Sequence, residues 1–236
     1  RGSAAVNEAS ESTELQRSTQ LTRVVDAPEV TGVVLLAIDT ALGTSVALGA
    51  NGRIVEASSD DPLRHAEALG GMLRQVFDAA GVAPDAVTGV VVGIGPGPFT
   101  GLRVGIAAAQ AFALGRGVPL LPLQGHEAVA LAVLEQGAAA GVRIVQDAKR
   151  RELFVTEYRG LDWAGVPERS VDPHLVTRVE LQAGPSDVWP ERIPAARLVQ
   201  LAARRLAAGH GFEAEQAVYL RAPDVAQPSV PKRVST

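Results

Sequence analysis

The segment GIGPGPFTGLRVG, Gly93–Gly105, follows the apolar run Val87–Val92 and determines how the first half of the chain is built. Glycine and proline end the apolar run, and the alanine-rich stretch Thr100–Leu114 that comes next is typical of a helix. The segment therefore predicts a rigid turn from a buried strand to the amino terminus of a helix, an arrangement typical of α/β proteins.

The glycines of this turn fit neither of two common phosphate-binding motifs. A dinucleotide fingerprint needs G-x-G-x-x-G, and Gly95, Gly97 and Gly101 are spaced one residue too widely. A P-loop ends in Gly-Lys-Ser/Thr, whereas leucine and arginine follow Gly101. Two interpretations remain open: an anion held at the helix amino terminus with the help of Arg103, or a purely architectural hinge stiffened by prolines.

Upstream of the turn the sequence predicts a three-stranded antiparallel meander. Val33–Asp39 is a continuous apolar run that ends in an acid, as expected for a strand buried on both faces. Thr44–Gly49 and Arg53–Ser58 flank the pair Asn51-Gly52, which readily takes the positive φ angles of a hairpin turn. A helix is then expected between the capping sequence Asp60–Pro62 and Gly81, from the helical spacing of its apolar residues.

The second half repeats this order of elements. The expected elements are a strand at Val118–Leu123, a helix at Gly125–Glu135, strands at Arg143–Asp147, Glu152–Tyr158 and Leu175–Val179, and a helix at Ala195–Ala208. Two blocks that each include a strand ending in aspartate, further strands and helices predict a duplicated α/β unit.

Composition excludes several classes of function. With a formal charge of −4 the chain as a whole does not attract RNA, so contact with nucleic acid would need a partner's surface. The absence of cysteine removes disulfides and cysteine metal sites, and His126 lacks the second histidine, at position 130, of a zinc-protease helix. No metal site is expected, no run reaches the ~20 apolar residues of a membrane span, and the cytoplasm is the expected location.

Catalytic motifs are also incomplete. Asp39 could bind Mg²⁺ through water or hydrogen-bond its own turn, and the lack of a second carboxylate nearby favours the turn. Gly43–Ala47 comes nearest to the serine-hydrolase motif G-x-S-x-G but leads into a strand and not a helix. No catalytic residue is therefore assigned.

Five segments, taken in order, give the chain its resemblance to the bacterial TsaB (YeaZ) family. They are LLAIDTALGTSVAL at 35–48, RHAEAL at 64–69, GIGPGPFTGLRVG at 93–105, QDAKRRELF at 146–154 and VYLRAPD at 218–224. The string GPG-x-FTGLR-x-G is highly specific to TsaB and its paralogue TsaD, and the chain departs from it at Pro98, where serine is common. This change removes a hydroxyl from the loop and stiffens it.

The resemblance implies an α/β fold of the tandem ribonuclease-H-like type found in sugar kinases, Hsp70 and actin. Residues 32–124 would form the first subdomain, 125–217 the second and 218–236 an extended tail. Residues 1–31 lack the apolar segment of a signal peptide and are expected to be a flexible leader or an expression remnant.

The resemblance also implies a non-catalytic subunit needed to make threonylcarbamoyladenosine at position 37 of tRNA. TsaD carries out the transfer, TsaE is an ATPase of the same assembly, tRNA is reached only through the complex, and the chain alone would form a homodimer. The competing interpretation is a stand-alone peptidase or nucleotide hydrolase of the same fold.

In that family the first two helices bind the partner. Carried over by position, the expected contact residues are His65, Leu69, Met72, Leu73, Val76, Phe99, Leu102, Arg103 and Ile106. No cofactor is expected for the chain alone. ATP or ADP at the TsaD interface would involve Asp39, Gly97, Thr100 and Arg103.

Overall fold

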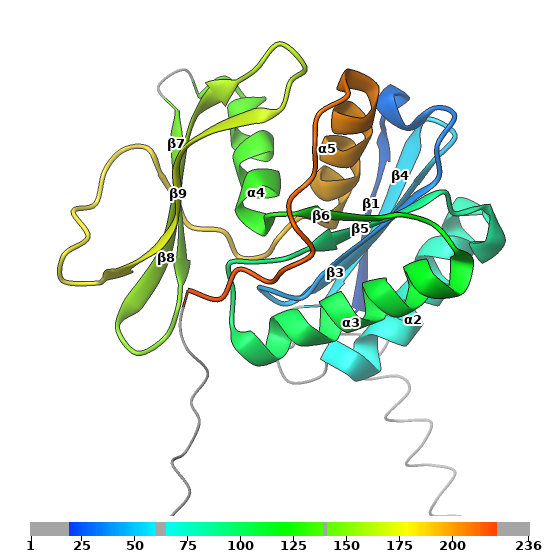
Figure 1. Ribbon diagram of the computed structural model, residues 1–236, viewed down its shortest axis with the longest axis horizontal. Coiled ribbons are helices and arrows are strands. Elements are labelled where there is room, and N and C mark those ends of the chain that lie inside the picture. Colours follow the sequence, from blue (N-terminus) through cyan, green and yellow to red (C-terminus); the bar gives the residue numbers. More distant parts are fainter. Residues whose placement is uncertain (1–18, 60–64, 139–140, 221–236) are drawn as a thin grey trace, which may run out of the picture.

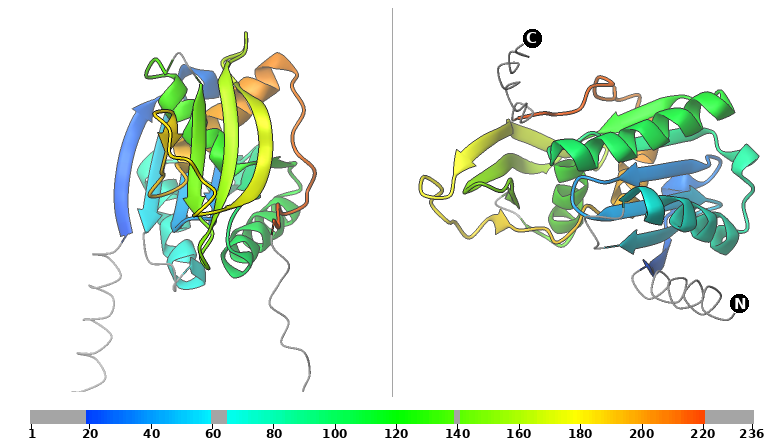
Figure 2. Two further views of the ribbon diagram at one scale, coloured as in Figure 1. Left: turned by 90° about the vertical axis from the view of Figure 1, so that its left-hand side faces the viewer. Right: turned by 90° about the horizontal axis from the view of Figure 1, so that it is seen from below.

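A computed structural model describes residues 19–59, 65–138 and 141–220 of the protein. Two β-sheets lie side by side, and helices α4 and α5 fill the space between them, while α2 and α3 cover the opposite face of the larger sheet (Figure 1). The views in Figure 2 show the smaller sheet at one end of the molecule. Within the described residues no helix is long and apolar enough to cross a membrane.

The larger sheet has six strands in the order β1-β4-β3-β2-β5-β6. Their bounds are β1 Thr19–Asp26, β2 Leu35–Asp39, β3 Thr44–Ala50, β4 Arg53–Ser59, β5 Gly89–Gly93 and β6 Leu120–Leu123. Strands β2, β3 and β4 form the predicted antiparallel meander, and β2, β5 and β6 run parallel. Asn51 and Gly52 have φ angles of 52° and 75°, as their hairpin turn requires.

Both faces of the larger sheet are apolar because helices cover both of them. Helices α2 (His65–Ala80) and α3 (Phe99–Arg116) bury Leu36, Ile38 and Leu48 on one face. Helix α5 (Ala195–Ala208) packs on the other face, against a second cluster. Short 3-10 turns at Pro28–Val30 (η1) and Pro84–Ala86 (η2) lead into β2 and β5.

The smaller sheet has the order β10-β7-β8-β9 and is backed by α4 (Gly125–Leu134). Its strands are β7 Val142–Asp147, β8 Glu152–Leu161, β9 Pro167–Thr177 and β10 Asp187–Val188. Strand β9 is longer than the predicted Leu175–Val179, because its first residues are polar and give no apolar signal.

Two predicted boundaries need correction. Residues 19–31 are not a flexible leader: β1 pairs antiparallel with β4, and Ala27 and Val30 are buried. The division at residue 124 is crossed by α5, which lies in the second half of the sequence but packs on β2 and β3 of the larger sheet. The predicted cap Asp60–Pro62, residues 1–18 and residues 221–236 lie outside the described residues.

Candidate functional site

Asp39 lies at the carboxyl end of β2 and is enclosed by the protein. The residue is 1% exposed. Oδ1 accepts a hydrogen bond from the Ala41 backbone N–H at 2.8 Å, and Oδ2 has no hydrogen-bond partner among the described residues. Burial raises the pKa of Asp39 from 3.8 to about 7, although the Ala41 hydrogen bond acts in the opposite direction.

Glycine backbone forms the walls around this carboxyl group. A Cβ added at Gly93 would lie 1.7 Å from Asp39 Oδ2, and one added at Gly125 would lie 3.2 Å from it. The end of β5 and the start of α4 therefore pass directly over the group. Contact of Asp39 with a nucleotide stays a prediction, and the burial of this residue in the structure does not favour it.

The glycine-rich turn packs against the same end of β2. A Cβ at Gly97 would lie 2.8 Å from the Ala41 side chain. Thr40 Oγ1 donates to the Gly101 carbonyl at 2.7 Å and accepts the Gly105 N–H at 2.9 Å, which ties the start of α3 to β2. Gly97 is therefore buried by packing and does not reach the surface, whereas Thr100 is exposed.

In the second half, His126 is buried between two polar side chains. Its Nδ1 lies 2.8 Å from Thr156 Oγ1 and its Nε2 lies 3.0 Å from Gln146 Oε1. Gln146 Nε2 in turn donates to the Ala41 carbonyl at 3.4 Å, which links the two halves of the chain. Burial lowers the pKa of His126 to about 4, with the Gln146 hydrogen bond opposing this, so the ring is neutral and serves as a structural link.

The predicted partner residues divide into buried and accessible groups. Four of them are buried in the chain's own core, so the prediction that their side chains face a partner is wrong: Leu69, Met72, Val76 and Leu102. Leu73 and Ile106 are half-buried and pack on that core. Phe99 is half-buried and Arg103 is exposed, while the His65 side chain lies outside the described residues.

The sides of α2 and α3 that face away from the sheet carry small residues among charged and polar ones such as Glu67, Asp78 and Gln110. We call this surface the outer helix face, and we define it by the exposed residues Gly70, Gly71, Arg74, Ala107, Ala111 and Leu114. A Cβ at Gly70 or Gly71 would have no neighbour within 4 Å, so these glycines are not required by packing inside the chain. Leu114 is 85% exposed. None of the small residues of this face was among the predicted contact residues, which on α2 are mainly apolar side chains.

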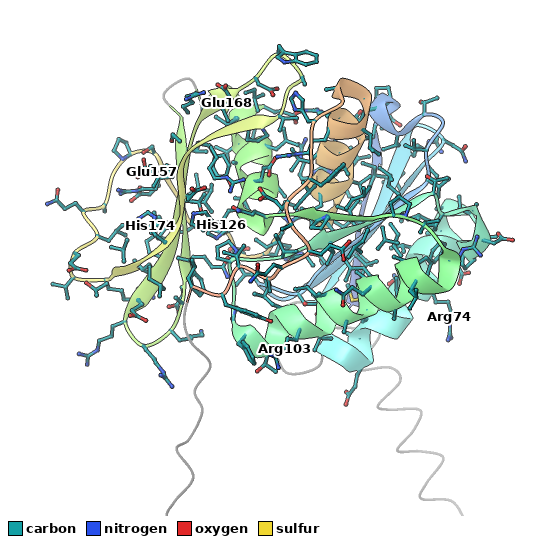
Figure 3. The ribbon with its side chains drawn as sticks, in the orientation of Figure 1. Arg74, Arg103, His126, Glu157, Glu168 and His174 are labelled. Carbon is teal, nitrogen blue, oxygen red and sulfur yellow. The ribbon has the colours of Figure 1, made fainter. Side chains whose placement is uncertain are left out.

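An aromatic and cationic cluster marks the amino-terminal end of α3. The Phe99 and Tyr219 ring centroids are 4.8 Å apart, and the Arg103 guanidinium lies 3.7 Å from the Phe99 centroid. Arg103 Nε also donates to the Tyr219 hydroxyl at 3.4 Å. Figure 3 shows Arg103 at this end of α3 and Arg74 on α2. Tyr219 belongs to the segment VYLRAPD but was not among the predicted site residues; the Val218 N–H, which donates to the Ile94 carbonyl, brings it here.

Comparisons with known proteins agree with this architecture. The family model of TsaD, tRNA N6-adenosine threonylcarbamoyltransferase, matches residues 62–171. A solved structure described as an uncharacterized protein with similarity to peptidase YEAZ from Pseudomonas aeruginosa is 28% identical, with a TM-score of 0.71. A second, described as YeaZ from Pseudomonas aeruginosa, is also 28% identical, with a TM-score of 0.67.

Each structural match covers 80% of this chain and 100% of the other. Comparison with the curated proteins gives no match. The two sheets, their strand order and these likenesses confirm the predicted ribonuclease-H-like α/β fold.

Proposed function

Because the chain is a YeaZ (TsaB)-like protein with a TsaD-family domain, we propose that it is a non-catalytic subunit for tRNA threonylcarbamoyladenosine synthesis. The modification is placed at position 37 of the tRNA. In this proposal the chain binds a TsaD-like paralogue through the outer helix face, and a TsaE-like ATPase joins the same assembly. The cytoplasm is the proposed location.

The observation that carries the proposal is that Asp39 is enclosed by the protein, whereas the outer helix face of α2 and α3 is exposed. In ribonuclease-H-like kinases and ATPases the cleft between the two halves is the place for nucleotide chemistry, but here Asp39 is sealed by Gly93 and Gly125. On the outer helix face, by contrast, small residues let a second pair of helices approach closely. Binding through this face is therefore better supported than catalysis in the cleft.

The same face would serve a second copy of the chain when the TsaD-like partner is absent. A homodimer of this kind uses one patch twice and is closed by two-fold symmetry. Of the four residues predicted to contact ATP or ADP at the interface, Thr100 and Arg103 remain accessible. A nucleotide bound there would be held between the partners, with tRNA recruited through the complex.

A charge placed on the outer helix face tests the proposal. Ala107 is exposed, so Ala107→Glu is expected to leave the fold intact while introducing a carboxylate that the complex must bury. We expect co-purification with the same organism's TsaD-like protein to fall by at least about a hundredfold, or ~3 kcal/mol. Modified adenosine in tRNA should be lost together with the complex.

The matched control is Ala207→Glu, which makes the same change at an exposed position of α5. It should leave both complex formation and tRNA modification as in the wild type. An Ala107→Glu protein that still binds the TsaD-like partner with unchanged affinity would contradict the proposal. Phosphate release or peptide cleavage by the purified chain alone would favour the hydrolase interpretation instead.

A further inference from the structure

The turn between β7 and β8 holds three consecutive cationic residues in an uncommon backbone conformation. Lys149, Arg150 and Arg151 have φ angles of 62°, 52° and 63°, in the left-handed region. We call these three residues the basic turn. All three are exposed, and they are among only four non-glycine residues with positive φ in the described chain.

Local preference does not explain this conformation. Residues with a Cβ are disfavoured in the left-handed region by roughly 1–2 kcal/mol each, and they normally occur there singly, most often as asparagine or aspartate. Three in succession persist only where the surroundings impose them, and such positions concentrate at functional sites. Contacts with the rest of the structure must therefore hold the basic turn in this conformation.

Backbone hydrogen bonds and one aspartate hold the basic turn. Asp147 Oδ1 accepts the Lys149 N–H at 2.9 Å, and the Glu152 N–H donates to the Lys149 carbonyl at 3.0 Å. From the other side, the Arg178 N–H donates to the Arg151 carbonyl at 2.8 Å. These hydrogen bonds fix the turn at its first residue, Lys149, and at its last, Arg151.

The basic turn gathers three exposed cations on a short stretch of chain. Arg178, which follows β9, adds a fourth cation: its Nη2 lies 3.1 Å from Asp147 Oδ1. The Lys149 Nζ lies 3.4 Å from Asp147 Oδ2, so one carboxylate serves two of the four cations. Several exposed cations from two segments of the chain, the turn and the residue after β9, suit the repeated phosphates of a polyanion.

The position of the turn agrees with such a role. It lies at the same end of the molecule as the amino-terminal end of α3, which carries the exposed Arg103 (Figures 1 and 3). A partner bound to the outer helix face would therefore share this end. Since the chain as a whole carries a charge of −4, the local cations would add to a partner's affinity for a polyanion without giving strong binding alone.

We propose that the basic turn binds the phosphate backbone of the tRNA that the assembly modifies. This inference rests on the proposed function. It assigns the chain a direct contact with RNA, in addition to its contact with the TsaD-like partner.

The test compares two double variants of the turn in the complex with the TsaD-like protein. Arg150→Gln with Arg151→Gln removes two charges; Arg150→Gly with Arg151→Gly removes the same charges and suits the left-handed backbone. Fluorescence anisotropy of labelled tRNA is measured over a series of salt concentrations. Both variants should raise the Kd at least about tenfold and reduce the slope of log K against log salt by about two.

Two readouts separate RNA binding from a structural role. The glycine variant should melt at a higher temperature than the glutamine variant, because it relieves the disfavoured φ angles, yet bind tRNA as weakly. The control, Arg23→Gln with Arg53→Gln, removes two exposed arginines from β1 and β4 of the larger sheet. These strands lie away from β7 and β8 (Figure 1), so the control should change the Kd by less than about twofold.

Unchanged tRNA affinity and salt slope in both turn variants would overturn the inference. Loss of co-purification with the TsaD-like protein would also overturn it, because the turn would then belong to a protein interface. Failure of the proposed function is seen separately, as a wild-type chain that does not co-purify with the TsaD-like protein. In that case the isolated chain is titrated with tRNA at low salt, where weak phosphate contacts are measurable, and the inference fails if the turn variants bind as well as the wild type.

Discussion

Replacing Asp39 by asparagine should make the stability of the protein depend on pH in a way that the structure specifies. Asp39 is fully enclosed, and burial raises its pKa from 3.8 to about 7. An acid with a raised pKa holds its proton in the folded state where the unfolded chain has released it. Its protonated form therefore supports folding below pH 3.8, and this contribution is lost as the pH rises towards 7.

The size of this effect follows from the pKa difference. The step from 3.8 to about 7 corresponds to about 4 kcal/mol in total, of which about 3 kcal/mol falls between pH 4.5 and pH 8. Asparagine keeps an oxygen for the Ala41 N–H but cannot ionise. The free energy of unfolding of Asp39→Asn minus that of the wild type should therefore increase by about 3 kcal/mol over this range.

Urea unfolding at half-unit steps of pH measures that difference directly. Taking the difference is necessary because other buried groups titrate in the same range. Asp85→Asn, at an exposed carboxylate, is the matched control and should follow the wild-type profile. If the difference for Asp39→Asn stays constant from pH 4.5 to pH 8, the carboxyl group is open to solvent. Asp39 is then not enclosed by Gly93 and Gly125, and nucleotide chemistry at this residue becomes the better interpretation.

Two further predictions concern the buried link and the glycine walls. His126→Gln should have a lower free energy of unfolding than the wild type at pH 7. The folded pKa of His126, about 4, lies below the ordinary 6.5, so the wild type loses stability as the pH falls from 6.5 to 4. The difference between variant and wild type should therefore shrink by about 3 kcal/mol between pH 7 and pH 4. A deficit that does not change with pH would place the imidazole in contact with water. Gly93→Ala should lose more than about 3 kcal/mol because its Cβ would overlap Asp39, whereas Gly70→Ala, with open space around it, should gain up to about 1 kcal/mol. Thermal melts of both glycine variants suffice, and similar melting temperatures would contradict the packing around Asp39.

Elements with strong local signals were predicted well from the sequence. The meander β2-β3-β4 and the helix Ala195–Ala208 match the structure because continuous apolar runs, an Asn-Gly turn and helical spacing are each local properties. Strand β1 was missed because its pairing with β4 depends on residues some thirty positions away. A polar stretch such as TQLTRVVD carries no mark of that pairing.

The sequence did not separate the core side of each helix from its exposed side, and the reason is physical. A helix that lies on a sheet has one apolar side, and that side packs against the sheet. Leu69, Met72 and Val76 are therefore core residues of this chain, and their spacing is evidence for folding and not for binding. The signal for a close helix contact lies on the opposite side, where Ala107 is exposed and a Cβ added at Gly70 would meet no described residue within 4 Å.

In the strand-to-helix turn, glycines that are needed for close packing look the same in the sequence as glycines that are needed to bind a ligand. Gly93, Gly97 and Gly105 each lie where a Cβ would overlap Asp39, Ala41 or Thr40, all at the end of β2. A phosphate cradle needs glycine for the same reason, which is close approach to the backbone. The two cases differ in what makes the approach: here it is residues at the end of β2 that lie against the glycines. A glycine-rich turn of this kind therefore indicates a ligand only where the acid at the end of the neighbouring strand is open to solvent, and in this protein that acid is closed.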